Sequence, residues 1–357
     1  MSNNSNNHKD GIKVEIPKNT NLNNLQQSTI FGGLKLRTFN QRIEDAKNQP
    51  VPKQLFSHFI YENEITVLFA KTNAGKSVLS VQIGDSISKG SPIHSDFKFE
   101  GNAQKVLYLD CEMTDKQVEK RVSQDWRNHY SFSEDYLSLT INHEADLPDG
   151  ISMEDRMLCD IDNAIEMSGA KIIIIDNLTY LGNELEKGKF AARLMKVLKS
   201  KKEKKGLTIL ILAHTPKVPA FTPIDINHLA GSSKLGQFID SAFFIGISTK
   251  DSNLRYLKQV KIRSGEKIYG ADNVPVFELN KIVTQGGARN FLAFEFTGRY
   301  ESEQLHIAPS DSDEKMSKEE LVVEYDKEGK SLRWIAKELH ISKSSVSRIL
   351  KRCKEEK

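Results

Sequence analysis

Short apolar runs that alternate with longer amphipathic stretches set the strongest constraint on how this chain can fold. The runs are apolar throughout, which is typical of strands covered on both faces of a sheet. Strands separated by helices predict a mostly parallel sheet and an α/β fold class. The five runs cover residues 65–70, 106–110, 172–176, 207–213 and 242–247. Two later runs, 256–262 and 291–296, alternate more and fit an antiparallel extension of the sheet.

The composition changes near both ends of the chain, and these changes predict its domain organisation. Residues 1–30 are rich in Asn and Ser and poor in apolar side chains, so we expect a disordered arm. Residues 308–313 read Ala-Pro-Ser-Asp-Ser-Asp, which is typical of a polar linker. We therefore predict an α/β domain with its lead-in at 31–305, a linker at 306–315 and a small all-α domain at 316–357.

Length and composition exclude several classes of protein. A chain of 357 residues suggests about two domains, and a hydrophobic fraction of 38% supplies a core. No apolar run approaches the roughly 20 residues that span a bilayer, and the polar N-terminus lacks the pattern of a secretory signal. Three cysteines far apart argue against a disulfide framework or a zinc site. We expect a cytoplasmic protein without a membrane partner.

The net charge of +3 becomes informative only when the chain is divided. Residues 315–357 hold twelve Lys and Arg against eight Asp and Glu, a balance of +4. The first 314 residues therefore balance at −1, so all the surplus positive charge lies in the C-terminal segment. Local positive charge of this kind fits contact with nucleic acid.

The first apolar run leads into a loop that matches the phosphate-binding pattern G-x-x-x-x-G-K-[ST], except that Ala70 replaces the first glycine. Backbone N–H groups of such a loop surround a β-phosphate, and the next helix directs its positive end at the same anion. Ala70 is tolerable there if its φ is negative. We predict ATP as ligand, with Lys76 on its β- and γ-phosphates and the Ser77 hydroxyl on Mg²⁺. The predicted cofactor-binding residues are Ala70, Lys71, Thr72, Asn73, Ala74, Gly75, Lys76 and Ser77.

Later strand ends carry polar side chains that can complete the chemistry. Asp176 follows four isoleucines and can hold the Mg²⁺ water shell, with capping of the next helix as the alternative role. The next residue is Asn177 rather than Glu, so the base is not adjacent. Glu112 lies past the end of another strand, where it can position or deprotonate water, and Asp110 competes for that role. His214 can contact the γ-phosphate or be an ordinary strand-end histidine.

Two cations end a further strand. Lys261 and Arg263 are two residues apart, so on a strand they point to the same side. Two cations on one face suit a phosphate, although a solvated face is the alternative. Acting in trans they would matter greatly, because an arginine finger contributes on the order of 10³ to 10⁵ in rate.

These stretches together resemble the RecA-like ATPase core of the DnaB/RepA hexameric helicase group. They are residues 70–77, 109–113, 172–177, 212–215 and 261–265, and the resemblance covers about residues 45–300. It implies a RecA-like mostly parallel sheet with a P-loop, ATP and Mg²⁺ as cofactors, and a homo-oligomeric ring. By that resemblance the catalytic residues are Lys76, Glu112, His214, Lys261 and Arg263, and the metal-binding residues are Ser77 and Asp176.

The resemblance also implies central loops that contact single-stranded DNA, at about residues 178–189 and 217–236. Three features depart from the family pattern. Ala70 replaces glycine, His214 stands where DnaB has glutamine, and too few ordered residues precede the core for the N-terminal helical domain of DnaB. The loading and primase contacts of DnaB are therefore not carried over.

Residues 331–350 have the spacing of a helix-turn-helix, with residues 319–325 as a preceding support helix. Ser342 can cap the second helix. This pattern resembles the small helix-turn-helix of resolvases and sigma-like regulators, and a three-helix protein-interaction module is the alternative. The predicted DNA-binding residues are Lys343, Ser344, Ser345, Ser347 and Arg348 in the major groove, with Lys351 and Arg352 on phosphates.

Three functions follow from these features. The first is an oligomeric, DNA-dependent RepA-like ATPase that serves as replication helicase or initiator of a plasmid or mobile element. The second is an ATP-switched DNA-binding regulator of transcription or copy number that does not unwind. The third, an adaptor with a degenerate site, fits least well because the residues needed for hydrolysis are all present.

Overall fold

The computed structural model describes residues 29–31, 34–142, 144, 151–177, 187–216, 218, 222–229, 236–284, 286–308, 318–339 and 341–355. The predicted arm at 1–30 and linker at 306–315 therefore lie mostly outside the described residues. The chain divides into two compact units, one up to Val51 and one from Pro52 onward. The residues of the predicted lead-in up to Val51 thus belong to the N-terminal unit.

The N-terminal unit contains a short hairpin and one helix. Strand β1 (Thr29–Phe31) pairs antiparallel with β2 (Leu34–Leu36), and helix α1 covers Phe39–Lys47. The helix begins after Thr38, whose hydroxyl accepts a hydrogen bond from the backbone N–H of Gln41. The Gln41 side chain accepts one from the Thr38 N–H in return, a capping box that satisfies two N-terminal donors.

A nine-stranded sheet forms the centre of the second unit, in the order β15-β14-β13-β12-β5-β11-β10-β6-β9. The six strands from β12 to β9 run parallel, and β13, β14 and β15 extend the sheet antiparallel. The predicted α/β fold with a mostly parallel sheet is confirmed. The nine strands are β5 (Ile65–Ala70), β6 (Val106–Asp110), β9 (Tyr136–Thr140), β10 (Ile172–Asp176), β11 (Thr208–His214), β12 (Ser241–Ile247), β13 (Leu254–Lys261), β14 (Val274–Val283) and β15 (Arg289–Glu301).

All five predicted core strands are present within one residue of their expected bounds. The predicted antiparallel extension is also confirmed, because the runs at 256–262 and 291–296 fall in β13 and β15. The sequence did not predict β9 or β14. β9 has no fully buried residue, and β14 is buried only over its first four positions, so neither carries a continuous apolar run.

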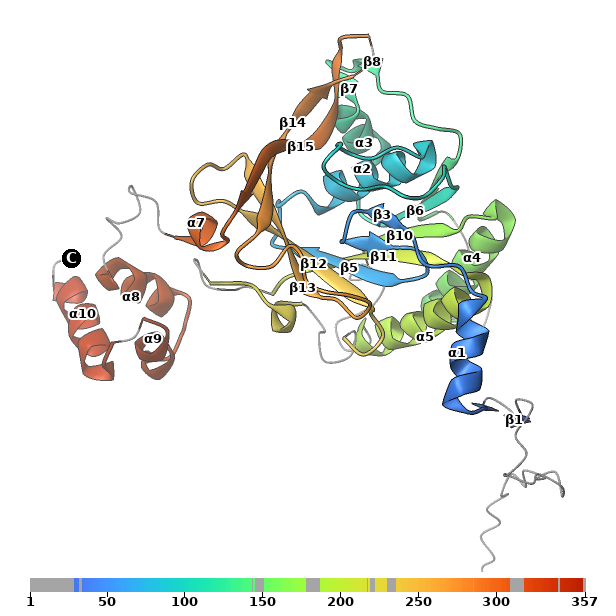
Figure 1. The fold of residues 1–357 in the computed structure, drawn as a ribbon. Helices are drawn as coiled ribbons and strands as arrows, with labels where there is room; N and C mark the ends of the chain where they lie inside the picture. The colour runs from blue at the N-terminus through green and yellow to red at the C-terminus, as the bar shows by residue number, and fades with distance from the viewer. Residues whose placement is uncertain are drawn as a thin grey trace, which may run out of the picture. The chain divides into compact units, whose positions relative to one another are not determined.

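Helices cover both faces of the parallel strands, with α2 on one side and α4 and α5 on the other (Figure 1). The four isoleucines of β10 are at most 2% exposed, as expected for a strand buried on both faces. Burial of each such side chain contributes roughly 1.5–3 kcal/mol. The helices are α2 (Lys76–Lys89), α3 (Asp115–Arg121), α4 (Met153–Ser168) and α5 (Lys187–Lys205). Minor elements are β3 (Gln54–Phe56), β4 (Ile60–Tyr61), β7 (Ser123–Gln124), β8 (Arg127–His129), the 3-10 turn η3 (Ile226–His228) and α7 (Gln304–Ile307).

Three further helices follow, α8 (Lys318–Lys327), α9 (Leu332–Glu338) and α10 (Lys343–Glu355). They enclose a small hydrophobic core of their own, in which Val322, Ile335 and Val346 are fully buried. The expected second helix and its cap are present. Within the part of the chain that the structure describes, no helix has both the length and the apolar character needed to cross a membrane.

Candidate active site

The phosphate loop joins the carboxyl end of β5 to the first turn of α2. Ala70 ends the strand and does not have a positive φ, so glycine is not required there. The left-handed positions are instead Asn73 (φ 62°) and Gly75 (φ 100°), directly before Lys76 begins the helix. Glycine suits the second position because it adopts positive φ without strain. The helix therefore directs its N-terminal N–H groups and its positive dipole end at the loop.

Lys76, the first residue of α2, is almost buried where the loop ends, with 7% of its surface exposed. Burial lowers the pKa of its ammonium group, and the nearby carboxylates of Asp176 and Glu112 oppose that shift. A largely buried cation near two carboxylates is well placed to receive the anionic phosphates of a nucleotide. Lys71 is also half-buried, and burial lowers its pKa, whereas Thr72 and Asn73 are exposed.

Residues of the antiparallel extension contact the phosphate loop, and the sequence did not predict these contacts. Arg255 of β13 is 6% exposed, and its Nε donates to the carbonyl of Ala74 at 3.0 Å. The Phe294 ring of β15 lies so close to Gly75 that an added Cβ would meet it at 3.0 Å. The Gln82 side chain of α2 bonds both the N–H and the carbonyl of Phe294. No local sequence pattern predicts these contacts, because the residues that make them are about 180 to 220 positions apart in the chain.

Asp176 is buried at the end of β10, beside the start of α2. Its Oδ2 accepts a hydrogen bond from the Tyr108 hydroxyl at 2.7 Å, and Ser80 Oγ lies 3.1 Å from the same hydroxyl. Burial raises the pKa of the Asp176 carboxyl to about 6, although hydrogen bonds from Ser77 and Tyr108 lower it. Tyr108 was not predicted as a site residue, since it reads as a core position within an apolar run.

The residues around Asp176 fit a magnesium ion. The Oδ1 atom of Asp176 is buried and has no hydrogen-bond partner among the described residues, and the Ser77 hydroxyl is nearby. Mg²⁺ prefers hard oxygen ligands and keeps several waters, so one carboxylate and one hydroxyl suffice when substrate phosphates supply the rest. No cluster of three or more His, Cys, Asp or Glu side chains suited to a metal occurs among the described residues.

A chain of polar contacts links Lys76 to Glu112 across the carboxyl edge of the sheet. Lys76 Nζ lies 3.3 Å from His214 Nδ1, and the Asn177 side-chain amide lies 2.9 Å from His214 Nε2. The amide of Asn177 also donates to Glu112 Oε1, which is 3.6 Å from His214 Nε2. Lys76 Nζ and the Asn177 amide nitrogen can only donate, and a neutral imidazole has one acceptor nitrogen, so the ring accepts a hydrogen bond from one of these two neighbours at a time. The structure therefore brings together three predicted residues and one, Asn177, that sequence reasoning did not assign.

Asp110 has a different place from the one considered for it. Its Oδ1 accepts hydrogen bonds from the backbone N–H groups of Glu112 and Met113, at 3.0 and 2.9 Å. The Asp110 carboxylate therefore shapes the turn after β6. The same turn directs Glu112 outward, where its side chain is 39% exposed and open to water.

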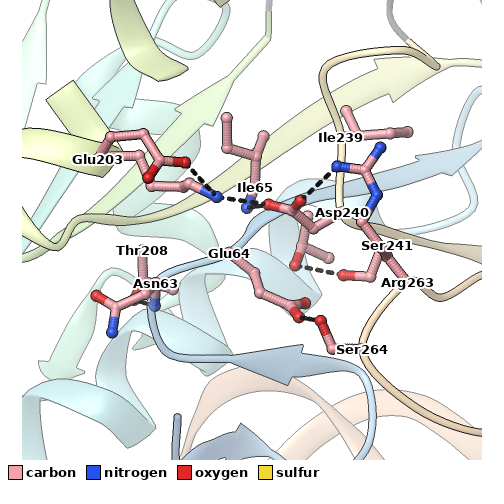
Figure 2. A network of polar contacts seen from close by, with 12 residues as sticks. Asn63, Glu64, Ile65, Glu203, Thr208, Ile239, Asp240, Ser241, Arg263 and Ser264 are labelled. Carbon is pink, nitrogen blue, oxygen red and sulfur yellow. Dashed lines mark hydrogen bonds and ion pairs between the residues drawn. The ribbon is translucent and has the colours of Figure 1, made fainter. Parts of the chain in front are cut away.

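Lys261 and Arg263 lie at the opposite edge of the sheet, near the start of β12. Figure 2 shows Arg263 beside Asp240 there. Strand β13 ends at Lys261, which pairs with Ala242. Arg263 lies beyond the end of the strand, so the prediction that strand geometry points both side chains to the same side is wrong. Lys261 Nζ donates to the carbonyls of Gly236 and Ile239, and Arg263 Nη1 donates to Asp240 Oδ1 at 3.0 Å. Burial, and secondly the charge of Arg263, lower the pKa of Lys261. Neither cation faces the phosphate loop of its own chain.

The predicted DNA-binding residues occupy the exposed arc of α10. Lys343, Ser344, Ser347 and Arg348 are exposed, as are Lys351 and Arg352, opposite the buried Val346 and Leu350. Ser345 differs, because it is half-buried and its Oγ lies 2.8 Å from the Oγ of the capping residue Ser342. Its hydroxyl supports the start of the helix. Of the predicted central loops, residues 178–186, 217, 219–221 and 230–235 lie outside the described residues.

One comparison with known protein families covers the phosphate loop. Residues 34–220, more than half of the chain, match the model of the AAA domain family. A KaiC-like protein of the hyperthermophilic archaeon Pyrococcus horikoshii OT3 is similar at 13% identity, over 68% of this chain and 93% of that chain, with a TM-score of 0.44. No curated protein matches the sequence. The extent of the family match shows that this chain belongs to the AAA domain family.

Proposed function

We propose that this chain is a RecA-like, magnesium-dependent ATPase that works as a homo-oligomeric ring on DNA. In this proposal it is a cytoplasmic replication helicase or initiator of a plasmid or mobile element, of the DnaB/RepA group. The observation that carries the hydrolytic part is the contact chain from Lys76 through His214 and Asn177 to Glu112. It joins the cation that binds phosphate to a carboxylate that can accept a proton.

The proposed reaction assigns each group a step. Water held by Glu112 attacks the γ-phosphorus of ATP, and its proton passes to the Glu112 carboxylate. The bond from the γ-phosphorus to the bridging oxygen breaks, and ADP leaves with the electron pair. Lys76 and the loop N–H groups bind the phosphates, and Asp176 with Ser77 would hold Mg²⁺, which supplies neutralising charge. His214 lies between Lys76 and Asn177, so loss of the γ-phosphate can alter the position of Glu112.

The substitution Glu112→Gln tests the hydrolytic proposal. The variant should bind ATP as the wild type does, because Lys76 and the loop are intact, while turnover should fall by about 10² to 10⁴ because glutamine cannot accept a proton. ATP binding by calorimetry and phosphate release measure the two effects. Glu119→Gln, which removes a carboxylate from the partly exposed side of α3, is the matched control and should keep the rate. Retained turnover in Glu112→Gln would refute the assignment of Glu112.

The geometry at the far edge of the sheet supports the oligomeric part. β5 has six residues, so the edge with Lys261 and Arg263 lies about 20 Å from the phosphate loop of the same chain. Such a distance exceeds the reach of either side chain. If these cations act on a phosphate, they act on a nucleotide bound by a neighbouring copy.

The second candidate is an ATP-switched regulator that binds duplex DNA and does not unwind it. The helical unit α8–α10 favours it, because the unit has its own core and an exposed basic arc on α10. A helix with basic residues on its exposed side fits the major groove. The same unit would also hold a helicase ring at an origin, so DNA-stimulated turnover and strand displacement separate the two candidates.

A further inference from the structure

Asp240 sits at the amino edge of the sheet, one residue before β12, and is 7% exposed. Its two carboxylate oxygens have different partners (Figure 2). Oδ2 accepts hydrogen bonds from the backbone N–H of Ile65 at 2.9 Å and from Lys202 Nζ of α5 at 3.0 Å. Oδ1 accepts one from Arg263 Nη1 at 3.0 Å. One oxygen is therefore fixed to the scaffold, and the other is presented to Arg263.

The backbone on both sides of Arg263 is held as well. Lys261 Nζ donates to two carbonyls before β12, and the Ser264 hydroxyl donates to Glu64 Oε1. The Arg263 side chain itself is 51% exposed, and Asp240 is its ion-pair partner among the described residues. These contacts fix where the side chain of Arg263 starts, and the carboxylate of Asp240 fixes where its guanidinium points.

The pair has little to contribute to the free energy of unfolding. Ion pairs with an exposed partner typically contribute little to stability, and the Arg263 side chain is half exposed. Asp240 keeps two other hydrogen bonds if Arg263 moves, so its buried charge is not left without partners. The ion pair therefore contributes little to stability but sets the direction of the Arg263 guanidinium. Because Asp240 holds only one of its nitrogens, the guanidinium still offers other N–H donors to an anion.

We propose that Asp240 is a positioning residue that orients Arg263 toward the phosphates of a nucleotide bound by a neighbouring copy of this chain. The inference rests on the proposed trans action of Arg263. In this role Asp240 acts only through the guanidinium of Arg263. Loss of orientation lowers the rate because a displacement of about 1 Å at a reacting centre can cost 10²-fold.

A mixing experiment tests this in full-length chains. One partner carries Arg263→Ala, so its phosphate loop is intact but it offers no finger. The other carries Lys76→Ala, so it offers the finger but cannot bind phosphate. ATP turnover in the mixture reports on composite sites alone. Adding Asp240→Asn to the Lys76→Ala chain should lower the kcat of the mixture about tenfold or more, with KM for ATP unchanged, because the loop belongs to the other chain.

Glu203→Gln in the Lys76→Ala chain is the matched control. Glu203 is exposed and contacts Lys202 in the same network without touching Arg263, so the mixture should keep its rate. Light scattering and thermal melting check assembly and folding. If the Asn variant does not fold, Asp240→Glu replaces it, since it keeps the charge but shifts the carboxylate, and the same loss is expected.

The two failures are distinguishable. No turnover in the starting mixture, with both chains assembled, refutes trans action and the inference with it. Turnover in the starting mixture that Asp240→Asn leaves unchanged or increases refutes positioning by Asp240 while trans action stands. An increase would mean that Asp240 restrains Arg263 instead of aiming it.

Discussion

Asn177 shows how one side chain can organise the end of several strands. It is fully buried, follows Asp176 through a cis peptide bond, and its amide contacts both Glu112 and His214. From the sequence, Asn177 only marked the absence of an adjacent glutamate. Asn177 lies between β6 and β11 because the strand order is β11-β10-β6. A local sequence pattern does not predict which parallel strands become neighbours.

Single residues at the carboxyl edge were easier to predict than their partners. Lys76, Ser77 and Asp176 follow from local patterns, a strand with a glycine-lysine-serine loop and an isoleucine run with a terminal Asp. The structure brings them together as expected. Tyr108 and Arg255 could not be predicted, because Tyr108 lies within an apolar run and Arg255 directly precedes one, and the role of each side chain depends on a distant hydrogen-bond partner.

Glu64 provides a pH prediction at the residue scale. Burial, as the largest cause, raises its pKa above the ordinary value of 4.5, while hydrogen bonds from Ser264 and Ser241 lower it. A carboxyl whose pKa is raised by folding costs stability when ionised, and that cost is relieved as pH falls through the raised pKa. The free energy of unfolding of the wild type, relative to that of Glu64→Gln, should therefore increase as the pH is lowered from 7 to 4.5.

Urea denaturation of both proteins across that pH range measures the difference. Glu203→Gln is the control, because Glu203 is exposed and its difference from the wild type should stay flat over the same range. A difference for Glu64→Gln that stays flat, or that decreases on acidification, would contradict the prediction.

At the scale of elements, the long hairpin of β14 and β15 is the part of the fold that the sequence described least well. β15 packs on α2 as well as pairing with β14, and Phe294 reaches Gly75 in the phosphate loop. The β14 sequence contains Pro275 and has a half-exposed second half, so its alternation is weak. Tertiary packing on α2 defines this strand more than its own propensity does.

Helix α10 carries the element-scale prediction. Arg348 lies on its exposed arc, so Arg348→Ala should weaken binding of a duplex DNA about tenfold at fixed salt, whether the guanidinium contacts a base or a phosphate. Fluorescence anisotropy with a labelled duplex of arbitrary sequence measures the change. Lys327→Ala, which removes an exposed cation at the end of α8, is the matched control and should bind as the wild type does. Equal affinity of all three proteins would argue for the alternative role as a protein-interaction module.

At the scale of the whole molecule, the small net charge of +3 conceals an uneven distribution. The surplus lies in the segment that forms α8–α10, while the residues before it balance at −1. We expect duplex DNA affinity to depend on that segment and hydrolysis on the sheet edge with the phosphate loop. Removing residues 315–357 should therefore abolish duplex affinity and leave ATP turnover without DNA in place.

ATP turnover of the full chain with no DNA, single-stranded DNA or duplex DNA, followed together with strand displacement, decides between the proposed functions. A DNA-dependent ring ATPase should hydrolyse ATP faster with single-stranded DNA and displace the strand of a forked duplex, and Lys76→Ala should do neither. Stimulation without displacement would favour the regulator. Turnover that is the same with and without DNA would contradict a DNA-dependent ATPase.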